Sequence, residues 1–553
     1  MEQIPSFNQY IEDSVIKFWD KDAFTDYKGA TLQFHDVARK IEKLHIMFEN
    51  SGVKRGDKIA LCGRNSSHWA VAFLATLTYG AIAVPVQNEF TPEQIHNIVN
   101  HSESKLLFVG DVVCTQVNPD MMPALEGIVY LPDFSIVISR SEQLTFAREH
   151  LNEIFGKRYP KYFRKEHIHY YKEQSPEELA MINYTSGTTG FSKGVMLPYR
   201  ALWGNIDYVL KCLAPNVKPG SNLVSILPMA HMYGLAVEFL FGFINGCHLY
   251  FLNRMPSPSL IAEAFAEVKP RLIVAVPLVV EKIIRRKVLA EVQTNRMKLL
   301  LNMPVINKKI KQHIRDRIME AFGGNAFEII VGGAPLNQGI EEFLNSVGVP
   351  ITIGYGTTET APLITFANYD KYKIASCGPV VDHMEAKVVS SDPANVPGEL
   401  IARGMNVMLG YYKNEEATNA VLDKDGWFHT GDLATMAPSG HIYIKGRIKN
   451  MLLGANGQNV YPEEIEDKLN NMPLVGESII IQRDTKLVAL VHPEIEDKEA
   501  MDFDDDDVKG IMDENLKTLN NQLPPFCKIA AIEIQKEEFQ KTAKKSIKRY
   551  LYK

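Results

Sequence analysis

The sequence predicts an α/β fold, in which a large N-terminal domain of mostly parallel sheets covered by helices is followed by a small α+β domain. The chain of 553 residues is several times the length of an ordinary domain, so two or more domains are expected. Strand-like segments at 58–61, 81–86 and 106–109 alternate with helix-like segments at 68–79 and 92–100. This alternation is typical of parallel strands joined by crossover helices.

The same alternation continues later in the chain, with strands expected at 221–226, 272–276 and 328–331. After Pro379 the chain changes to short β-type runs separated by Asp, Pro and Gly turns, which predicts a small antiparallel β element closing the large domain. A charged, turn-rich segment follows Lys445. We therefore expect an N-terminal domain at 1–447 and a C-terminal domain at 448–553.

Composition and charge narrow the function classes. The hydrophobic fraction of 46% and the charged fraction of 23% are ordinary for a globular protein. A formal net charge of −6 disfavours broad nucleic-acid binding, which uses a basic face, so no nucleic-acid partner is expected. The first residues include acidic side chains and no apolar core, and the apolar run at 234–252 contains Glu238, Asn245 and His248. Neither a secretory signal nor a membrane span is expected, and a cytoplasmic protein is predicted.

Residues 184–194, with the sequence YTSGTTGFSKG, combine hydroxyls, glycines and one lysine. Glycine permits positive φ and lets backbone N–H groups approach phosphate oxygens closely. The hydroxyls add donors, and Lys193 adds a positive charge. Lys193 lies three residues after Gly190 and precedes Gly194, which excludes a Walker A motif. A flexible polar turn has no need of so many hydroxyls beside a lysine, so a phosphate-binding loop is predicted.

Three further segments follow in order, namely GYGTTET at 354–360, HTGD at 429–432 and KGRIK at 445–449. Together with YTSGTTGFSKGV at 184–195, they resemble core motifs of the adenylate-forming (AMP-binding) superfamily. That superfamily includes acyl-CoA synthetases, luciferases and nonribosomal-peptide adenylation domains. The resemblance implies that the sheets of the large domain are stacked and that the C-terminal domain is mobile.

The resemblance also implies binding of ATP and Mg²⁺. Thr358 would contact the α-phosphate, and Glu359 would hold Mg²⁺, which prefers carboxylate oxygens. Asp432 would accept hydrogen bonds from both ribose hydroxyls, and Arg447 would contact the ribose or a phosphate. Tyr355 would stack on adenine. The other nucleotide-binding positions implied in this way are Thr185, Ser186, Gly187, Thr188, Thr189, Gly190, Gly333, Ala334, Pro335, Gly354, Gly356 and Thr357.

Two positions concern the acid and the domain motion. His231 matches a position beside the carboxylate pocket, where it would touch the substrate or gate an acyl tunnel. Most histidines in such apolar company are satisfied core residues, and that interpretation is equally open. Lys449 matches the hinge about which the C-terminal domain rotates between adenylation and thiol transfer. Residues 454–457 would enter the site only in the second state.

The C-terminal segment departs from the superfamily pattern. The superfamily has a lysine in Thr-x-x-x-Lys-Ile/Leu-x-Arg, which neutralises charge between the acyl carboxylate and the α-phosphate. Aligning Thr542, Ile547 and Arg549 places Ser546 at the position of that lysine. The adjacent Lys545 is predicted to replace it. The alternative is that this lysine-rich tail is a solvated, disordered end.

Three segments, at 276–282, at 332–336 with 341–343, and at 410–414, resemble long-chain fatty acyl-CoA synthetases. The predicted reaction joins a fatty acid and ATP into acyl-AMP and pyrophosphate, after which coenzyme A takes the acyl group and AMP leaves. Fatty acid and CoA are thus the expected small-molecule partners, with peripheral membrane contact through the basic tail at 541–553. Two alternatives stay open. One is an enzyme that loads a carrier protein, and the other is a nucleotide-binding sensor that has lost adenylation.

Overall fold

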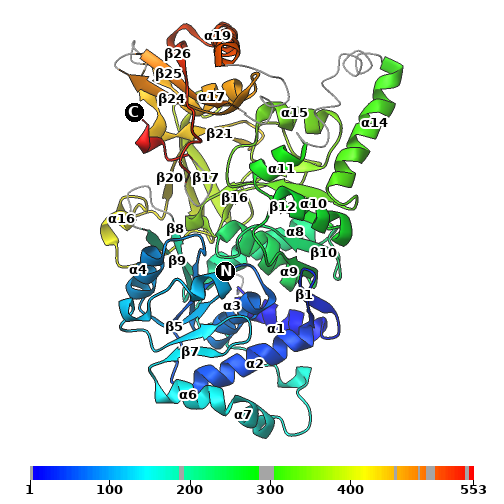
Figure 1. Ribbon diagram of the computed structural model, residues 1–553, viewed down its shortest axis with the longest axis vertical. Helices are drawn as coiled ribbons and strands as arrows, with labels where there is room; N and C mark the ends of the chain where they lie inside the picture. The colour runs from blue at the N-terminus through cyan, green and yellow to red at the C-terminus, as the bar shows by residue number, and fades with distance from the viewer. Residues whose placement is uncertain are drawn as a thin grey trace.

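The computed structural model describes residues 4–185, 192–284, 304–453, 458–483, 486–493, 505–541 and 547–552. Two large sheets form the centre of the N-terminal domain (Figure 1). The first has the order β19 (Gly410–Tyr411), β9 (Lys193–Pro198), β8 (Leu179–Thr185), β4 (Ile82–Val86), β3 (Lys58–Cys62), β5 (Ser104–Val109), β6 (Gly127–Tyr130), β7 (Ile136–Ser139). Its central strands, from β8 to β6, are parallel, which confirms the predicted alternation.

The second large sheet joins segments from distant parts of the sequence. Its order is β14 (Ile351–Ile353), β13 (Glu328–Val331), β12 (Leu272–Ala275), β10 (Asn222–Ser225), β11 (His248–Phe251), β1 (Asp22–Asp26), β2 (Thr31–Gln33). All neighbours are parallel except β1 and β2. Strand β1 therefore pairs on one side with β2, which follows it in sequence, and on the other side with the distant strand β11.

Helices cover both sheets, and α3 packs between them. They include α1 (Phe7–Lys17), α2 (Phe34–Asn50), α4 (Pro92–Ser102), α6 (Glu142–Glu149), α7 (Leu151–Arg158), α8 (Tyr199–Leu213), α10 (Pro258–Val268), α11 (Pro277–Ile284), α14 (Pro304–Ala321) and α15 (Gln338–Ser346). Helix α3 (Ser67–Tyr79) contacts β3 and β4 of one sheet and β1 of the other. The Ser66 hydroxyl caps it by accepting from Trp69 N at 3.1 Å, and Gly80 ends it with a φ of 87°.

The predicted antiparallel element is a separate four-stranded sheet. It has the order β17 (Met384–Val389), β18 (Gly398–Gly404), β20 (Phe428–Met436), β21 (Ile442–Arg447). Every neighbouring pair in it is antiparallel. Strand β21 ends where the chain turns into the C-terminal unit.

The C-terminal unit has its own hydrophobic core, which includes Val460, Leu469 and Leu519. Its sheet β24 (Val475–Arg483), β25 (Lys486–Pro493), β26 (Ile529–Ile534) is accompanied by α17 (Pro462–Asn470) and α19 (Asp505–Gln522). Figure 1 shows this unit at one end of the molecule, and α2, α6 and α7 at the opposite end. Among the described residues, no helix is long and apolar enough to cross a membrane.

The described part of the C-terminal tail is docked onto this unit. Arg549 forms an ion pair with Glu466, whose other carboxylate oxygen accepts from Ile480 N at 2.6 Å. Glu466 is buried, so the pair holds residues 547–552 against α17. The interpretation of the tail as a disordered end is therefore wrong for these residues.

Candidate active site

The predicted phosphate loop joins two paired strands. Strand β8 continues through Thr185, and β9 begins at Lys193, which lies opposite Thr185 in the antiparallel register. The two residues thus stand together at the base of the connection. The loop positions Ser186, Gly187, Thr188, Thr189 and Gly190 lie outside the described residues.

Tyr411 brings the lysine of this loop together with the predicted metal ligand. Its strand β19 pairs with the edge of β9, so that Tyr411 lies opposite Val195. Lys193 Nζ lies 4.7 Å from the centre of the Tyr411 ring, and Tyr411 Oη donates to Glu359 Oε1 at 2.8 Å. Burial and the Glu359 carboxylate raise the pKa of Tyr411, so it remains a phenol donor at neutral pH.

The segment that carries Glu359 is fixed by tight backbone contacts. It follows β14, and its first turn begins where Gly354 N donates to Val331 O at 3.0 Å. A Cβ on Gly356 would lie 1.7 Å from Pro362 O, so only glycine fits this position. Thr357 N donates to Pro362 O at 2.9 Å and to Thr360 Oγ1 at 3.1 Å. These contacts place Thr358 and Glu359 on a single 3₁₀ turn, η5 (Thr358–Thr360), in which Thr358 is buried.

A second cluster centres on Asp432. Tyr355 Oη donates to Asp432 Oδ2 at 2.6 Å, and Arg447 Nε lies 2.8 Å from Asp432 Oδ1. Asp432 and Arg447 face each other on β20 and β21, whereas Tyr355 comes from the short strand β15 (Tyr355–Gly356). Burial raises the pKa of Asp432, and the guanidinium opposes that rise. Both carboxylate oxygens thus already have protein donors.

Glu399 of β18 orients the HTGD segment. His429 Nδ1 lies 2.8 Å from Glu399 Oε2, and Gly431 N donates to Glu399 Oε1 at 3.2 Å. Asp432 N donates in turn to Thr430 Oγ1 at 3.0 Å. No sequence motif marks Glu399, because its partners lie about thirty residues away along the chain.

The predicted nucleotide-binding positions Gly333, Ala334 and Pro335 directly follow β13 and Gly332, which contact the segment that carries His231. Gly333 has a φ of +84°, which favours glycine. Tyr233 Oη donates to Ile330 O at 3.1 Å, and its ring lies against Gly332. His231 itself is partly buried, and its Nδ1 accepts from Tyr233 N at 3.3 Å. The segment that carries His231 thus packs against the chain directly before Gly333.

Glu238 is a buried carboxyl group that lies outside the sequence motifs of the site. It lies in the π-helix Gly234–Leu240, accepts from Ser225 Oγ at 3.0 Å and accepts from Leu227 N at 3.2 Å. Burial raises its pKa well above the usual range of a carboxyl group. These hydrogen bonds hold the end of β10, after which the His231 segment begins. A glutamate inside an apolar run was the available signal.

The predicted hinge lies between the two units. Lys449 is an exposed residue of the 3₁₀ turn η6 (Ile448–Asn450), and this turn directly follows Arg447. On either side of it, Lys445 Nζ lies 3.3 Å from Glu464 Oε1 and Asn450 Nδ2 donates to Glu463 Oε1 at 2.7 Å. Both partners belong to α17. Residues 454–457, Lys545 and Ser546 lie outside the described residues.

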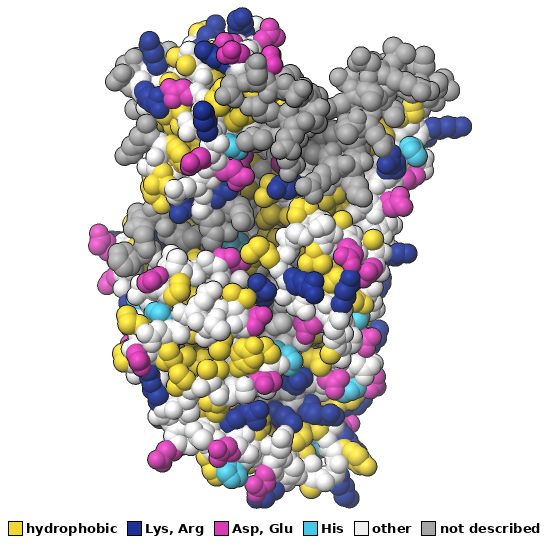
Figure 2. Space-filling model, in the orientation of Figure 1, with side chains coloured by type: hydrophobic (Ala, Val, Ile, Leu, Met, Phe, Trp, Pro, Cys, Tyr) yellow, Lys and Arg dark blue, Asp and Glu magenta, His cyan; other side chains and the backbone are white. Residues whose placement is uncertain are grey.

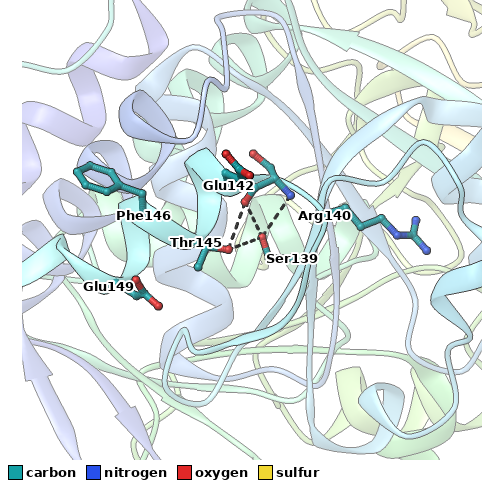
Figure 3. Close-up of a pocket in the computed structure, with 7 residues that line it drawn as sticks. Ser139, Arg140, Glu142, Thr145, Phe146 and Glu149 are labelled. Atoms are coloured by element: carbon teal, nitrogen blue, oxygen red, sulfur yellow. Dashed lines mark hydrogen bonds between the residues drawn. The ribbon is translucent and has the colours of Figure 1, made fainter.

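A surface hollow of about 460 Å³ lies beside β7 and α6, far from all these groups. Figure 3 shows its hydroxyls turned toward one another, with Thr145 Oγ1 donating to Ser139 Oγ at 2.9 Å. Ser141 N also donates to Ser139 Oγ, at 3.3 Å. The hydroxyls of this hollow bond to one another or to the backbone, and none of the predicted site residues lines it.

Comparison with known proteins shows the family of the chain. The model of the AMP-binding enzyme family matches residues 11–412, and that of the AMP-binding enzyme C-terminal domain matches residues 449–552. The chain is 31% identical to a long-chain-fatty-acid–CoA ligase of Escherichia coli O157:H7, over 86% of this chain and 82% of the relative. It is 26% identical to the long-chain-fatty-acid–CoA ligase ACSBG2 of Rattus norvegicus, over 93% of this chain and 77% of the relative. ATP-bound MatB from Rhodopseudomonas palustris shares the fold, with a TM-score of 0.75, 22% identity, and coverage of 99% of this chain and 98% of that chain.

Proposed function

The chain belongs to the AMP-binding enzyme family, and we propose that it is an ATP-dependent ligase that joins a long-chain fatty acid to coenzyme A. The observation that carries this proposal is a pair of side-chain clusters, Lys193–Tyr411–Glu359 and Tyr355–Asp432–Arg447. We call these two clusters the junction. The first offers a cation and a carboxylate suited to a metal-bound triphosphate. The second offers a buried carboxylate suited to sugar hydroxyls.

In the adenylation step, Glu359 would hold Mg²⁺, which neutralises phosphate charge when bound. Lys193, with Thr185 and the loop positions 186–190, would bind the β- and γ-phosphates, and Thr358 would contact the α-phosphate. Asp432 would bind the ribose, with Arg447 moving to the ribose or a phosphate. The adenine would lie on Tyr355 and beside Gly333-Ala334-Pro335. Catalysis by these groups is mainly positioning and charge neutralisation.

The second step would use a different face of the C-terminal unit. Rotation about Lys449 would replace Lys545 by residues 454–457 at the acyl-adenylate, where the CoA thiol attacks the acyl carbonyl and AMP leaves. We place the domain boundary of this motion at 447/448. Lys545 would neutralise the acyl carboxylate and the α-phosphate in the first step, in place of the lysine that Ser546 displaces.

The acid is assigned from the relatives and the apolar surroundings of His231. Both ligases named above act on long-chain fatty acids by name. Residues 235–241 behind His231 are buried, and all but Glu238 are apolar, which suits an acyl chain. We further propose that the enzyme works in the cytoplasm and touches membranes peripherally, where long-chain acids partition.

The test is AMP release from ATP, Mg²⁺ and CoA across fatty acids from short to long. Turnover that rises with chain length is the expected result. Replacing CoA by a carrier protein separates a carrier-loading enzyme, and fatty-acid-dependent exchange of pyrophosphate into ATP separates a nucleotide-binding sensor. Silence with every acid and both acceptors would contradict the proposal. Lys545→Ala should slow acyl-AMP formation; unchanged adenylation would reject Lys545 as the replacement lysine.

A further inference from the structure

A pocket of about 370 Å³ opens between α2, α6 and the connection before β7. Four of its lining residues are cations, Arg39, Lys40 and Lys43 from α2 and Arg148 from α6. Figure 2 shows a row of Lys and Arg side chains across the lower part of the molecule, where Figure 1 places α2. Arg39 and Lys43, four residues apart, lie on the same side of the helix. The α2 pocket, as we call it, thus gathers positive charge from two helices.

The hydrogen-bond partners of these cations are neutral. Lys40 Nζ lies 3.2 Å from His68 Nε2, Lys43 Nζ donates to Asn152 Oδ1 at 2.8 Å, and Arg148 Nε donates to Phe134 O at 2.9 Å. Within the described ranges, none of the four cations forms an ion pair.

The neighbouring Arg158 shows that the same surface can supply carboxylates. Its guanidinium pairs with Glu42 at 3.2 Å and Glu49 at 2.6 Å. The α2 pocket has carboxylates too, Asp36 and Asp133, but both accept from backbone groups. Asp36 Oδ2 accepts from Gln33 N at 3.1 Å, and Asp133 Oδ1 accepts from Ser135 N at 2.8 Å. The positive charge of the pocket is therefore not matched by ion pairs.

Partial burial makes this charge unfavourable without a ligand. Burial lowers the pKa of Lys40. Burial also lowers the pKa of Lys43, and the charges of Lys40, Arg39 and Arg148 lower it further. Four cations that repel one another, form no ion pair among the described residues and outnumber the two carboxylates of the lining form a preorganised site for an anion.

We propose that the α2 pocket binds the phosphate group of an anionic ligand. Two guanidinium and two ammonium groups supply many N–H donors, and a phosphate offers more charge and more acceptor oxygens than a carboxylate. The apolar wall formed by Leu44, Phe134 and Leu151 suits a ligand in which the phosphate adjoins an apolar group. Such a ligand is a phosphorylated small molecule or a phospholipid headgroup. The pocket lies at the end of the molecule opposite the C-terminal unit, so it is separate from the candidate active site (Figure 1).

The first experiment titrates the full-length protein with inorganic phosphate at constant ionic strength and follows heat release by calorimetry. The candidate active site also binds phosphate groups, so the informative quantity is the difference from Lys40→Gln/Lys43→Gln. We expect this variant to lose one class of saturable binding, or to weaken it at least about tenfold, because two charged donors are removed. The control Lys54→Gln/Lys218→Gln removes the same charge from exposed positions elsewhere and should bind like the wild type.

The second experiment distinguishes the sources of the phosphate. Vesicles containing an anionic phospholipid are compared with neutral vesicles in co-sedimentation, and glycerol phosphate is tested as a soluble ligand. Vesicle binding that Lys40→Gln/Lys43→Gln abolishes identifies a lipid headgroup, whereas loss of soluble binding alone identifies a small phosphate ester. Arg148→Gln provides a second, independent variant from another helix. Phosphate and vesicle binding that are the same in all these proteins would overturn the proposal. Ligase activity should be unchanged throughout, which keeps this test independent of the proposed function.

Discussion

The junction and the α2 pocket differ in the partners that they give to their charged side chains. At the junction, Asp432 accepts from Tyr355 and pairs with Arg447, and Glu359 accepts from Tyr411. In the α2 pocket, Lys40, Lys43 and Arg148 meet an imidazole, an amide and a backbone carbonyl. Asp432 thus has a charged partner without a ligand, whereas the three cations of the α2 pocket have none among the described residues.

This difference bears on how each region would treat a ligand. A buried carboxylate whose partner is removed carries a large desolvation cost, so the pairing with Arg447 keeps Asp432 in place before a ligand binds. A nucleotide must then exchange contacts with Tyr355 and Arg447, and only a ligand with suitable hydroxyls can do so. The α2 pocket would instead gain stability from any well-fitting anion, because the ligand relieves repulsion. The junction would therefore discriminate among ligands by the placement of their hydroxyls, and the α2 pocket would discriminate mainly by their negative charge.

The largest effect is expected from breaking the paired region at Asp432. Asp432→Ala should lower kcat/KM for ATP in acyl-AMP formation by at least about a hundredfold. The variant cannot accept the two charge-assisted hydrogen bonds from the ribose hydroxyls, which are worth about 1.5–3 kcal/mol each. Pyrophosphate exchange into ATP measures this step. Glu385→Gln, which disturbs an exposed pair with Arg403, is the control. Equal activity of both variants would remove Asp432 from the site.

Two adjacent tyrosines offer a sharper comparison inside the junction. Tyr411 donates to Glu359, whereas Tyr412 Oη donates to Glu103 Oε2 at 2.9 Å on the surface. Tyr411→Phe should raise the Mg²⁺ concentration for half-maximal adenylation about tenfold, because Glu359 loses its hydrogen-bond donor. Tyr412→Phe should leave the Mg²⁺ dependence unchanged. Equal Mg²⁺ curves for the two variants would show that Tyr411 does not orient Glu359.

A weaker contact joins the C-terminal unit to α15. This contact should affect the ratio of acyl-AMP formation to thioester formation. Asp467 Oδ1 accepts from Gln338 N at 3.3 Å, at the N-terminus of that helix. Asp467→Ala should change the ratio of acyl-AMP formation to thioester formation by about two- to fivefold, since half-exposed contacts are worth about 1 kcal/mol or less. Parallel assays of the two half-reactions measure the ratio. Asp513→Ala, on the exposed side of α19, should not change it.

The smallest expected effect is a change in thermal stability when a cation of the α2 pocket is removed in the absence of ligand. Lys43→Gln should raise the thermal midpoint in low salt by about 1 °C, because it removes repulsion among the cations of the α2 pocket. Added NaCl should shrink the difference by screening. Lys157→Gln removes a cation that is paired with Glu153 and should leave the midpoint unchanged or lower it. A lower midpoint for Lys43→Gln, measured by differential scanning calorimetry, would show that Lys43 stabilises the fold.

Much of the fold and several site segments could be predicted from local patterns. Strands and helices at 58–109 follow the alternation of apolar segments, and α3 is bounded by Ser66 and Gly80, whose preferences for a cap and for positive φ are properties of single residues. The antiparallel element after Pro379 follows from its turn residues in the same way. The positions of the motif glycines also have local causes, since Gly356 lies where any side chain would meet Pro362 O.

Tertiary structure alone decided which side chains became partners. The sequence marks Lys193 and Glu359 separately, but pairing of β19 with β9 inserts Tyr411 between them. The tertiary structure also places Tyr355 and Asp432, which are 77 residues apart, within hydrogen-bond distance. It brings α2 and α6 together around one pocket. Local patterns report the backbone preferences of neighbouring residues. Contacts across the chain depend instead on how whole sheets and helices pack, and no short segment contains that information.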